Sequence, residues 1–235
     1  MNLLPEEPSF APWNVASLDD FVTALSTSKS TESTPKIIAI DGRSAGGKTS
    51  LAARVHHLIP GSVIVHIDDI PSCATWRGPE AQASIQTDPL PEGCTYFDWL
   101  DNLVENVLEP LRVSKHVNYR PEAWDDWNRP AGAIDIPTTC PAVIIEGVGS
   151  SRRELSSYLD ASVWIQSDFD LAKTRGIARD GGSVEGWERF ENQEIPFFAE
   201  QKFWERADFV VCGTPETEHS EEEILVSSQT PLPTS

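Results

Sequence analysis

The chain has 235 residues, 39% of them apolar, and its 18 Lys and Arg against 37 Asp and Glu give a formal net charge of −19. A membrane span needs about 18 consecutive apolar residues, and no apolar run approaches that length, so we expect no membrane partner. No basic segment precedes an apolar one at the N-terminus, so we also expect no secretory signal and a cytoplasmic protein. The acidity argues against nucleic acid as a partner, because a face that neutralises phosphates must be basic.

The N-terminal segment, residues 1–35, is predicted to hold a short helix followed by a linker. Ser17 is a suitable N-cap for a helix over residues 18–25, and a Ser- and Thr-rich stretch follows it. Of the 18 basic residues, 17 lie between residues 36 and 213, so we assign the chemistry to that segment.

Five short runs rich in Val and Ile predict buried parallel strands. They span residues 36–41, 62–67, 142–146, 162–166 and 208–212. Nearly continuous apolar runs are expected where helices cover both faces of a parallel sheet. Helical periodicity over residues 48–59 and 97–111 separates some of these strands. The alternation predicts a doubly wound α/β fold.

Other segments depart from this alternation. Residues 70–140 insert much Pro and four Trp into the predicted sheet topology, and residues 214–235 are rich in Glu, Ser, Thr and Pro without periodicity. We interpret the latter as a disordered acidic tail. The four cysteines have no CxxC spacing and no His partner at metal-ligand spacing, so we expect neither a zinc site nor a disulfide framework.

One segment matches the phosphate-binding pattern G-x-x-x-x-G-K-S/T. Its residues are Gly42, Arg43, Ser44, Ala45, Gly46, Gly47, Lys48 and Thr49, followed by Ser50 in the predicted helix. The match follows a strand and opens a helix, as it must if backbone N–H groups and the helix N-terminus are to surround phosphates. We expect Lys48 to reach the β- and γ-phosphates of a nucleoside triphosphate and Thr49 to bind Mg²⁺. The alternative is a glycine-rich turn before a helix.

Carboxylates stand at the ends of two predicted strands. Asp68 and Asp69 follow the strand over residues 62–67, and Glu146 ends the strand over residues 142–146. Open α/β sheets bind ligands outside the carboxyl ends of their strands, so we expect these side chains to face the γ-phosphate. One Asp would be the base toward an acceptor hydroxyl and the other would contact metal or substrate. The alternative is structural, with the Asp pair capping a helix or a turn.

Two arginines follow the fourth predicted strand. Arg175 and Arg179 are four residues apart and share a helix face, where they would cover the transferring phosphoryl group and stabilise its charge. Gly181 and Gly182 offer a hinge for such a movement. The alternative is a pair of exposed helix arginines held by neighbouring Asp residues.

At these residues the chain resembles the uridine kinase-like branch of P-loop kinases, which includes phosphoribulokinase and pantothenate kinase relatives. The resemblance covers about residues 36–213 and rests on IIAIDGRSAGGKTSLA, HIDD, YFDWLDNLVENVLEPL, VIIEGVGS, TRGIARDG and ADFVVCG. It implies a P-loop NTPase fold with a five-stranded parallel sheet, helices on both faces, an acceptor-binding insert (70–140) and a lid (168–195). It also implies ATP and Mg²⁺. Asp68 then matches the catalytic Asp beside the metal, Glu146 the carboxylate that holds the metal's water, and Arg175 and Arg179 the lid arginines.

The acceptor segment departs from the family pattern. Where uridine kinases carry Tyr-Asp-Phe or Tyr-Asp-Trp, we align residues 123–127 (AWDDW), so that Trp124 takes the place of the tyrosine. Together with Asp69, Tyr119 and Arg120, it forms our predicted substrate-binding set, and a core within the insert is the alternative role for these aromatic residues. His66, within a strand, is interpreted as a packed core histidine.

We therefore predict an ATP- and Mg²⁺-dependent kinase with a small-molecule hydroxyl substrate, most simply a pyrimidine nucleoside. Asp68, Lys48, Arg175 and Arg179 would be its catalytic residues. Two alternatives stay open: a kinase for a different hydroxyl compound, such as a sugar or a pantothenate-like acid, and a nucleotide-binding regulator without such activity.

Overall fold

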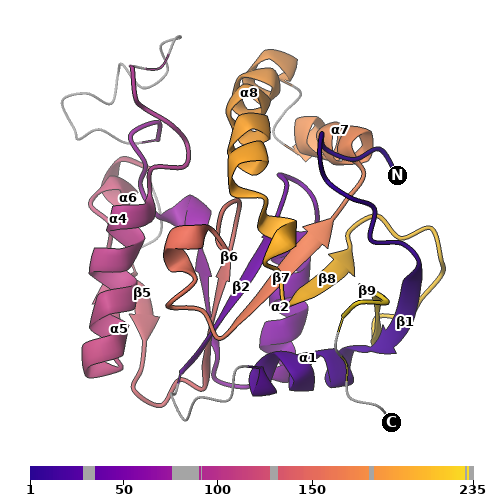
Figure 1. Cartoon of the computed structure of the whole chain (residues 1–235). Helices are drawn as coiled ribbons and strands as arrows, with labels where there is room; N and C mark the ends of the chain where they lie inside the picture. Colours follow the sequence, from indigo (N-terminus) through magenta and orange to yellow (C-terminus); the bar gives the residue numbers. More distant parts are fainter. Residues whose placement is uncertain are drawn as a thin grey trace.

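The fold is built on a seven-stranded sheet. The computed structural model describes residues 1–28, 35–75, 90, 92–127, 132–179, 183–230 and 232, and in this part of the chain the strand order is β1-β9-β8-β7-β2-β6-β3 (Figure 1). The strands of this sheet are β1 (Trp13–Ser17), β2 (Lys36–Gly42), β3 (Val63–His66), β6 (Ala142–Glu146), β7 (Ala161–Gln166), β8 (Phe209–Cys212) and β9 (Glu223–Ser227). A separate antiparallel pair is formed by β4 (Val117–Tyr119) and β5 (Ile134–Ile136).

The centre of the sheet is parallel, as the sequence predicts. β2 pairs in parallel with β6 on one side and with β7 on the other, and β3 and β8 extend the parallel part outward. All five predicted strands are confirmed, each to within a residue at either end. The parallel order brings the carboxyl ends of these strands to one edge, where the loops after β2, β3, β6 and β7 meet.

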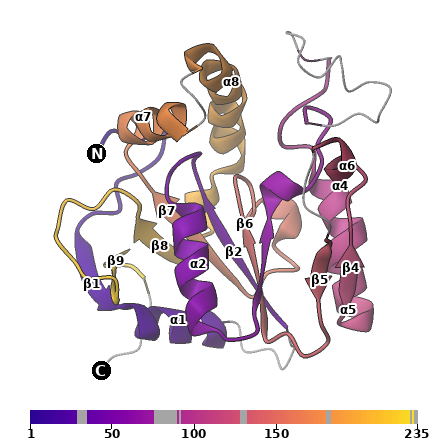
Figure 2. The same cartoon turned by 180° about the vertical axis from the view of Figure 1, so that it is seen from behind.

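Helices cover both faces of the sheet (Figures 1 and 2). They are α1 (Leu18–Thr27), α2 (Lys48–Leu58), α4 (Leu100–Leu103), the π-helical turn η3 (Val104–Leu108), α5 (Glu109–Ser114), α6 (Ala123–Asp126), α7 (Phe169–Arg179) and α8 (Val184–Gln201). Short 3-10 turns lie at η1 (Ile67–Asp69), η4 (Arg153–Leu155) and η5 (Phe203–Glu205). The helix predicted over residues 18–25 is confirmed as α1, whose N-cap Ser17 accepts a hydrogen bond from the Asp20 N–H.

β2 shows how one strand serves two cores. Ile38 and Ile40 point into the core beneath α1 and α2, whereas Ile37 and Ala39 point to the opposite core, which α4, η3 and α5 cover. All four are buried, which explains why the run is apolar without alternation. A third core, around Trp164, fills the space between β7, β8 and α8.

The C-terminal segment corrects a prediction. Residues 214–235 were expected to be disordered, but β9 pairs antiparallel with β1 and touches β8, and its Ile224, Leu225 and Val226 are buried. These three apolar residues lie among acidic ones, and their burial supplies the stabilisation that the composition of the tail does not suggest. The sheet therefore continues beyond the five predicted strands on the β8 side.

The cysteines correct another prediction. Cys73 and Cys94 form a disulfide, although no disulfide was expected from their spacing of 21 residues. The bond becomes possible because the chain returns to the end of η1 after the first part of the insert, and Asp98 holds the return by accepting a hydrogen bond from the Cys73 N–H (2.8 Å). Only the fold reveals this proximity.

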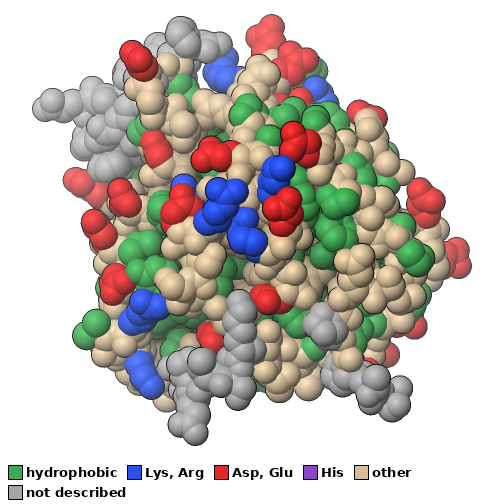
Figure 3. Space-filling model, in the orientation of Figure 1, with side chains coloured by type: hydrophobic (Ala, Val, Ile, Leu, Met, Phe, Trp, Pro, Cys, Tyr) green, Lys and Arg blue, Asp and Glu red, His purple; other side chains and the backbone are tan. Residues whose placement is uncertain are grey.

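Basic groups gather at the C-terminal end of α8. Arg153 and Arg206 donate hydrogen bonds to the carbonyl oxygen of Gln201, and Lys202 pairs with Glu6 (2.9 Å). Figure 3 shows Lys and Arg side chains clustered near the middle of this face, among dispersed acidic ones. Cations satisfy the carbonyl groups that a helix leaves unpaired at this end, so they fix the position of α8.

No helix within the described ranges is long and apolar enough to cross a membrane.

Candidate active site

The phosphate-binding loop lies between β2 and α2, as predicted. Gly47 caps α2 in the left-handed region (φ 104°), which favours glycine, and a Cβ on Gly46 would lie 2.9 Å from the Arg43 carbonyl oxygen. Lys48 is buried, and its Nζ donates to that same carbonyl oxygen (2.9 Å). The ammonium group of Lys48 is therefore held against the backbone of the loop.

A cavity of about 480 Å³ opens beside this loop, and all four predicted catalytic residues line it. It is lined by Ser44, Ala45, Gly47, Lys48, Thr49, Ser50, Asp68, Glu146, Val148, Arg175 and Arg179. These side chains come from the P-loop, α2, η1, the end of β6 and α7. Parallel strands thus bring together groups that lie more than a hundred residues apart.

Glu146 is held by two neighbours at the floor of this cavity. Its Oε1 accepts a hydrogen bond from Thr49 Oγ1 (3.2 Å) and lies 2.5 Å from His66 Nδ1. Burial alone would raise the pKa of Glu146, but the hydrogen bond from His66 and the charge of Lys48 outweigh it and lower the pKa. The same hydrogen bond raises the pKa of His66, against the effect of burial.

His66 therefore differs from its interpretation as a packed core residue. Its side chain is 37% exposed and faces the Glu146 carboxylate. The prediction that His66 lies in a strand is confirmed, but His66 is the last residue of β3. Because the last side chain of a parallel strand lies at the ligand-binding edge of the sheet, His66 is not packed in the core.

Asp68 and Asp69 occupy different surroundings. Asp68 is exposed, and it lines both the P-loop cavity and a second cavity of about 160 Å³. Asp69 lines neither cavity; its backbone carbonyl accepts a hydrogen bond from Trp124 Nε1 (2.9 Å). The pair thus separates into one carboxylate at the junction of two cavities and one residue that anchors the insert.

The two arginines predicted to lie in a lid are on α7, which packs closely against α8. Arg175 and Arg179 line the P-loop cavity, and Arg175 Nη1 donates to the Gly213 carbonyl oxygen (3.4 Å). Gly176 permits the close approach of the two helices, because a Cβ there would lie 1.9 Å from the ring of Trp187. The proposed hinge at Gly181 and Gly182 lies outside the described residues.

Of the predicted acceptor residues of the insert, Trp124 and Tyr119 pack in the core that α4, η3 and α5 cover, whereas Arg120 is exposed. Trp124 is 8% exposed, Tyr119 packs in the same core, and Arg120 pairs with Asp125 (2.6 Å). None of the three lines either of the two cavities that Asp68 borders. The alternative weighed for the aromatic residues, a core position, describes Trp124 and Tyr119.

Instead, other aromatic residues surround the second cavity beside Asp68. Its lining is Ile67, Asp68, Ile70, Ser72, Thr75, Tyr96, Phe97, Trp99, Val148 and Phe190. We call this the aromatic cavity. The sequence YFDW (residues 96–99) supplies three of these aromatic residues, but the helix predicted over residues 97–111 included most of them. In the structure that helix, α4, begins only at Leu100. No sequence pattern around Phe190 indicated that it lines a cavity.

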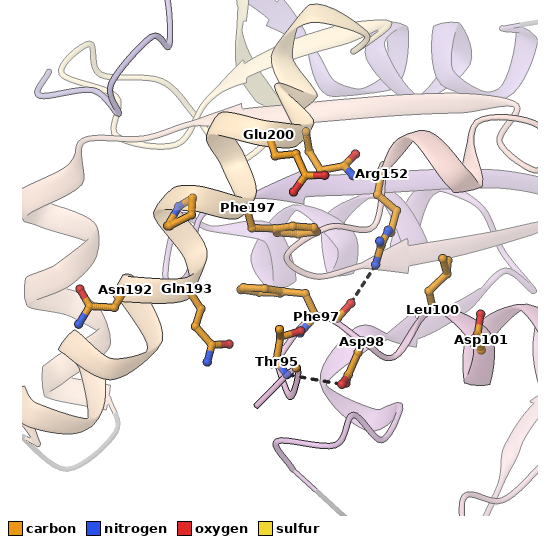
Figure 4. Close-up of a pocket in the computed structure, with 13 residues that line it drawn as sticks. Thr95, Phe97, Asp98, Leu100, Asp101, Arg152, Asn192, Gln193, Phe197 and Glu200 are labelled. Carbon is orange, nitrogen blue, oxygen red and sulfur yellow. Dashed lines mark hydrogen bonds between the residues drawn. The ribbon is translucent and has the colours of Figure 1, made fainter. Parts of the chain in front are cut away.

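Beyond Phe97 lies a further cavity of about 610 Å³ (Figure 4). The rings of Phe97 and Phe197 stack between the two sides, with centroids 4.4 Å apart and planes at 7°. Gln193, Phe197 and Glu200 enter from α8, while Arg152 donates to the Phe97 carbonyl oxygen (2.8 Å). Phe97 is therefore a wall between this cavity and the aromatic cavity.

Together, these features define a class of protein. The fold of the P-loop kinases has a phosphate-binding loop after a central parallel strand, and here strand-end acids and two arginines of α7 line the cavity beside that loop.

Solved structures share this fold. A possible uridine kinase from Bacillus stearothermophilus superposes with a TM-score of 0.52 at 18% identity, covering 82% of this chain and 96% of that one. A protein from Silicibacter sp. TM1040 that has been proposed as a fructose transport system kinase gives a TM-score of 0.57 at 16% identity, covering 82% and 95%. At such identities the likeness establishes the fold alone.

Sequence comparison adds one curated relative. Uridine kinase of Saccharomyces cerevisiae is 27% identical over 168 residues, which are 67% of this chain and 33% of that protein, so the chain spans about a third of the length of its relative. No protein-family model matches the chain. The chain is thus similar to the uridine kinase-like P-loop kinases in sequence and in fold, and the resemblance predicted from its motifs is confirmed.

Proposed function

We propose that the protein is an ATP- and Mg²⁺-dependent phosphotransferase that moves the γ-phosphate to a hydroxyl of a small molecule, with a pyrimidine nucleoside as the first candidate. The position of Asp68 carries the proposal, because this carboxylate lies where the P-loop cavity and the aromatic cavity meet. A general base must reach the acceptor hydroxyl while that hydroxyl faces the donor phosphate. The likeness to yeast uridine kinase supports the reaction class.

On the donor side, the loop residues 42–50 bind the phosphates of ATP. Backbone N–H groups of the loop and the N-terminus of α2 supply hydrogen-bond donors and a positive potential. Lys48 supplies the charge that reaches the β- and γ-phosphates. Its present contact with the Arg43 carbonyl keeps the ammonium group inside the loop.

The donor set at the cavity floor suits Mg²⁺. Hydroxyl and carboxylate oxygens are the ligands that this hard cation prefers, and Thr49 Oγ1 lies 3.2 Å from Glu146 Oε1. Asp68 lines the same cavity. When bound, Mg²⁺ neutralises charge on the phosphates. The task of Thr49 and Glu146 is to hold oxygen atoms in place from α2 and β6.

Transfer exchanges one phosphorus–oxygen bond for another. The acceptor oxygen bonds to the γ-phosphorus as the bond from that phosphorus to the β–γ bridging oxygen breaks, and ADP leaves with the bridging oxygen. Asp68 takes the proton of the acceptor hydroxyl. Arg175 and Arg179 stabilise the negative charge of the group in transfer. Positioning and charge stabilisation supply most of the catalysis.

We assign the acceptor to the aromatic cavity in place of the predicted set of Asp69, Tyr119, Arg120 and Trp124. Tyr96, Phe97, Trp99 and Phe190 offer ring faces and edges to a flat ligand such as a nucleobase. Ser72 and Thr75, in the same lining, offer hydroxyl groups for orientation. Trp124 and Asp69 support the cavity from behind through their hydrogen bond.

The test is acceptor-dependent ADP release by the purified protein with ATP and Mg²⁺. We expect uridine or cytidine to stimulate release, and a Lys48→Ala preparation, which lacks the phosphate-binding charge, to show no stimulation. A response only to a sugar or a hydroxy acid would keep the reaction class and replace the nucleoside. Tight ATP binding without any acceptor effect would contradict the proposal and favour a nucleotide-dependent regulator.

A further inference from the structure

A fully buried carboxylate links α8 to the phosphate-binding loop. Glu194 has no exposed surface, and its Oε1 accepts a hydrogen bond from the Ser44 N–H (2.7 Å). Its Oε2 lies 3.8 Å from Nη2 of Arg43, a loop residue that is itself 3% exposed. Arg43 also stacks on Phe169 of α7 (4.0 Å). Glu194 and Arg43 thus tie both lid helices to the loop.

This contact is costly and incompletely satisfied. Among the described residues, Glu194 Oε2 and Arg43 Nη1 have no hydrogen-bond partner although both atoms are buried. Burial raises the pKa of Glu194, which the Arg43 charge and the Ser44 N–H only partly offset. A buried charge pair is weak evidence for stability, since a well-packed apolar pair often serves better. Stabilisation of the fold is therefore a weak explanation for burying Glu194 and Arg43, which points to another role of the pair.

The residue before Glu194 makes the complementary contact. Gln193 Oε1 accepts a hydrogen bond from the Tyr96 N–H (3.0 Å), and Tyr96 lines the aromatic cavity. Figure 4 shows Gln193 reaching from α8 toward the segment that carries Thr95 and Phe97. Two consecutive residues of α8 therefore accept hydrogen bonds from two backbone N–H groups, one in the P-loop and one in the wall of the aromatic cavity at Tyr96. We call the latter the acceptor wall.

Resting on the function proposed above, we propose that Gln193 and Glu194 form a coupling bridge through which nucleotide in the P-loop positions the acceptor wall at Tyr96. Neither residue touches the reacting atoms; both act through the backbone that they hold. A loop movement at Ser44 displaces Glu194 and hence α8, and Gln193 carries the displacement to Tyr96. Such coupling typically changes the affinity at the second site by about 5- to 150-fold.

The test follows amide hydrogen exchange with and without Mg²⁺ and a non-hydrolysable imido analogue of ATP, alongside calorimetric binding of that analogue. In the wild type we expect the nucleotide to slow exchange both in α8 (Val184–Gln201) and in residues 93–99. In Gln193→Ala, which removes only the second contact, α8 should still respond while residues 93–99 no longer do. Gln193→Glu keeps an acceptor oxygen for the Tyr96 N–H and should restore the response.

Glu194→Leu tests the first contact, since an apolar side chain of similar size offers the Ser44 N–H no acceptor oxygen. We expect both segments to lose their response to nucleotide. Glu185→Leu, the same substitution at an exposed position of α8, is the matched control and should behave as the wild type. Because a change at the buried Glu194 can impair folding, the Gln193 variants alone decide the inference.

The outcomes separate this inference from the proposed function. A response of residues 93–99 that persists in Gln193→Ala, or that is absent from a wild type that binds nucleotide, overturns the bridge and leaves the kinase proposal standing. A wild type that fails to bind the analogue overturns both.

Discussion

At the scale of single residues, Glu146, the carboxylate that we propose for Mg²⁺, is already held in position by its neighbours. Its Oε1 is held by Thr49 from α2 and by His66 from β3, so two elements besides its own strand, β6, fix one oxygen atom. Groups that orient a metal ligand contribute to metal affinity although they do not touch the metal. His66 belongs to this supporting class in the site that we propose.

We predict that His66→Ala weakens Mg²⁺ binding to the nucleotide-bound protein by about 10- to 100-fold. The reason is that the Glu146 carboxylate loses the hydrogen bond that orients it. Calorimetric titration of Mg²⁺ measures this directly, and His57→Ala, an exposed histidine on α2, is the control. Unchanged or tighter binding in His66→Ala would show that His66 does not support a metal site.

The residues of the site differ in how far the sequence reveals them. The P-loop was predictable because its chemistry is contiguous, running from Gly42 to Thr49. Asp68 and Glu146 were predictable because strand ends meet at one edge of a parallel sheet. Phe190 was not, since the cavity that it lines exists only where α8 packs over Tyr96.

At the scale of elements, β9 is the clearest departure from expectation. The five parallel strands are recognisable in the sequence by nearly continuous runs rich in Val and Ile. In contrast, β9 has only three buried apolar residues and lies in an acidic segment. Its stability comes from its partners: β1 pairs with it over five residues, from Trp13↔Ser227 to Ser17↔Glu223. Neither strand of that pair is recognisable alone, because each depends on the other.

We predict that Ile224→Ala lowers the free energy of unfolding by about 2–5 kcal/mol, the usual cost of truncating a buried Ile. Ile224 is 2% exposed and packs in the core beneath α1 and α2. Glu222→Ala, two residues earlier and exposed, should have almost no effect. Urea unfolding of both variants makes the comparison. Equal stability would contradict a buried β9.

At the scale of the whole molecule, a strongly acidic chain holds a cavity that three cationic side chains and two carboxylates line. The net charge is −19, yet Lys48, Arg175 and Arg179 line the cavity that we assign to ATP. The acidic surface repels a triphosphate at a distance, so attraction must come from these groups, the loop amides and Mg²⁺ at short range. An acidic composition is therefore compatible with binding a nucleotide.

The two proposed sites share structural support as well as Asp68. α8 contributes Phe190 to the aromatic cavity, Phe197 to the stack on Phe97, and Glu194 to the P-loop. Its C-terminal carbonyls are fixed by Arg153 and Arg206. A helix held in this way at several points moves as one unit, which suits an enzyme that must align donor and acceptor before transfer.

The most direct test of the account is Asp68→Asn, assayed both for ATP binding by calorimetry and for phosphoryl transfer with the acceptor that the wild type uses. We predict ATP affinity within about threefold of the wild type, and transfer slowed by about 10²- to 10⁴-fold, because the loop remains intact while the base is lost. Wild-type turnover in this variant would contradict the account, since Asp68 would then not be the base between the two cavities.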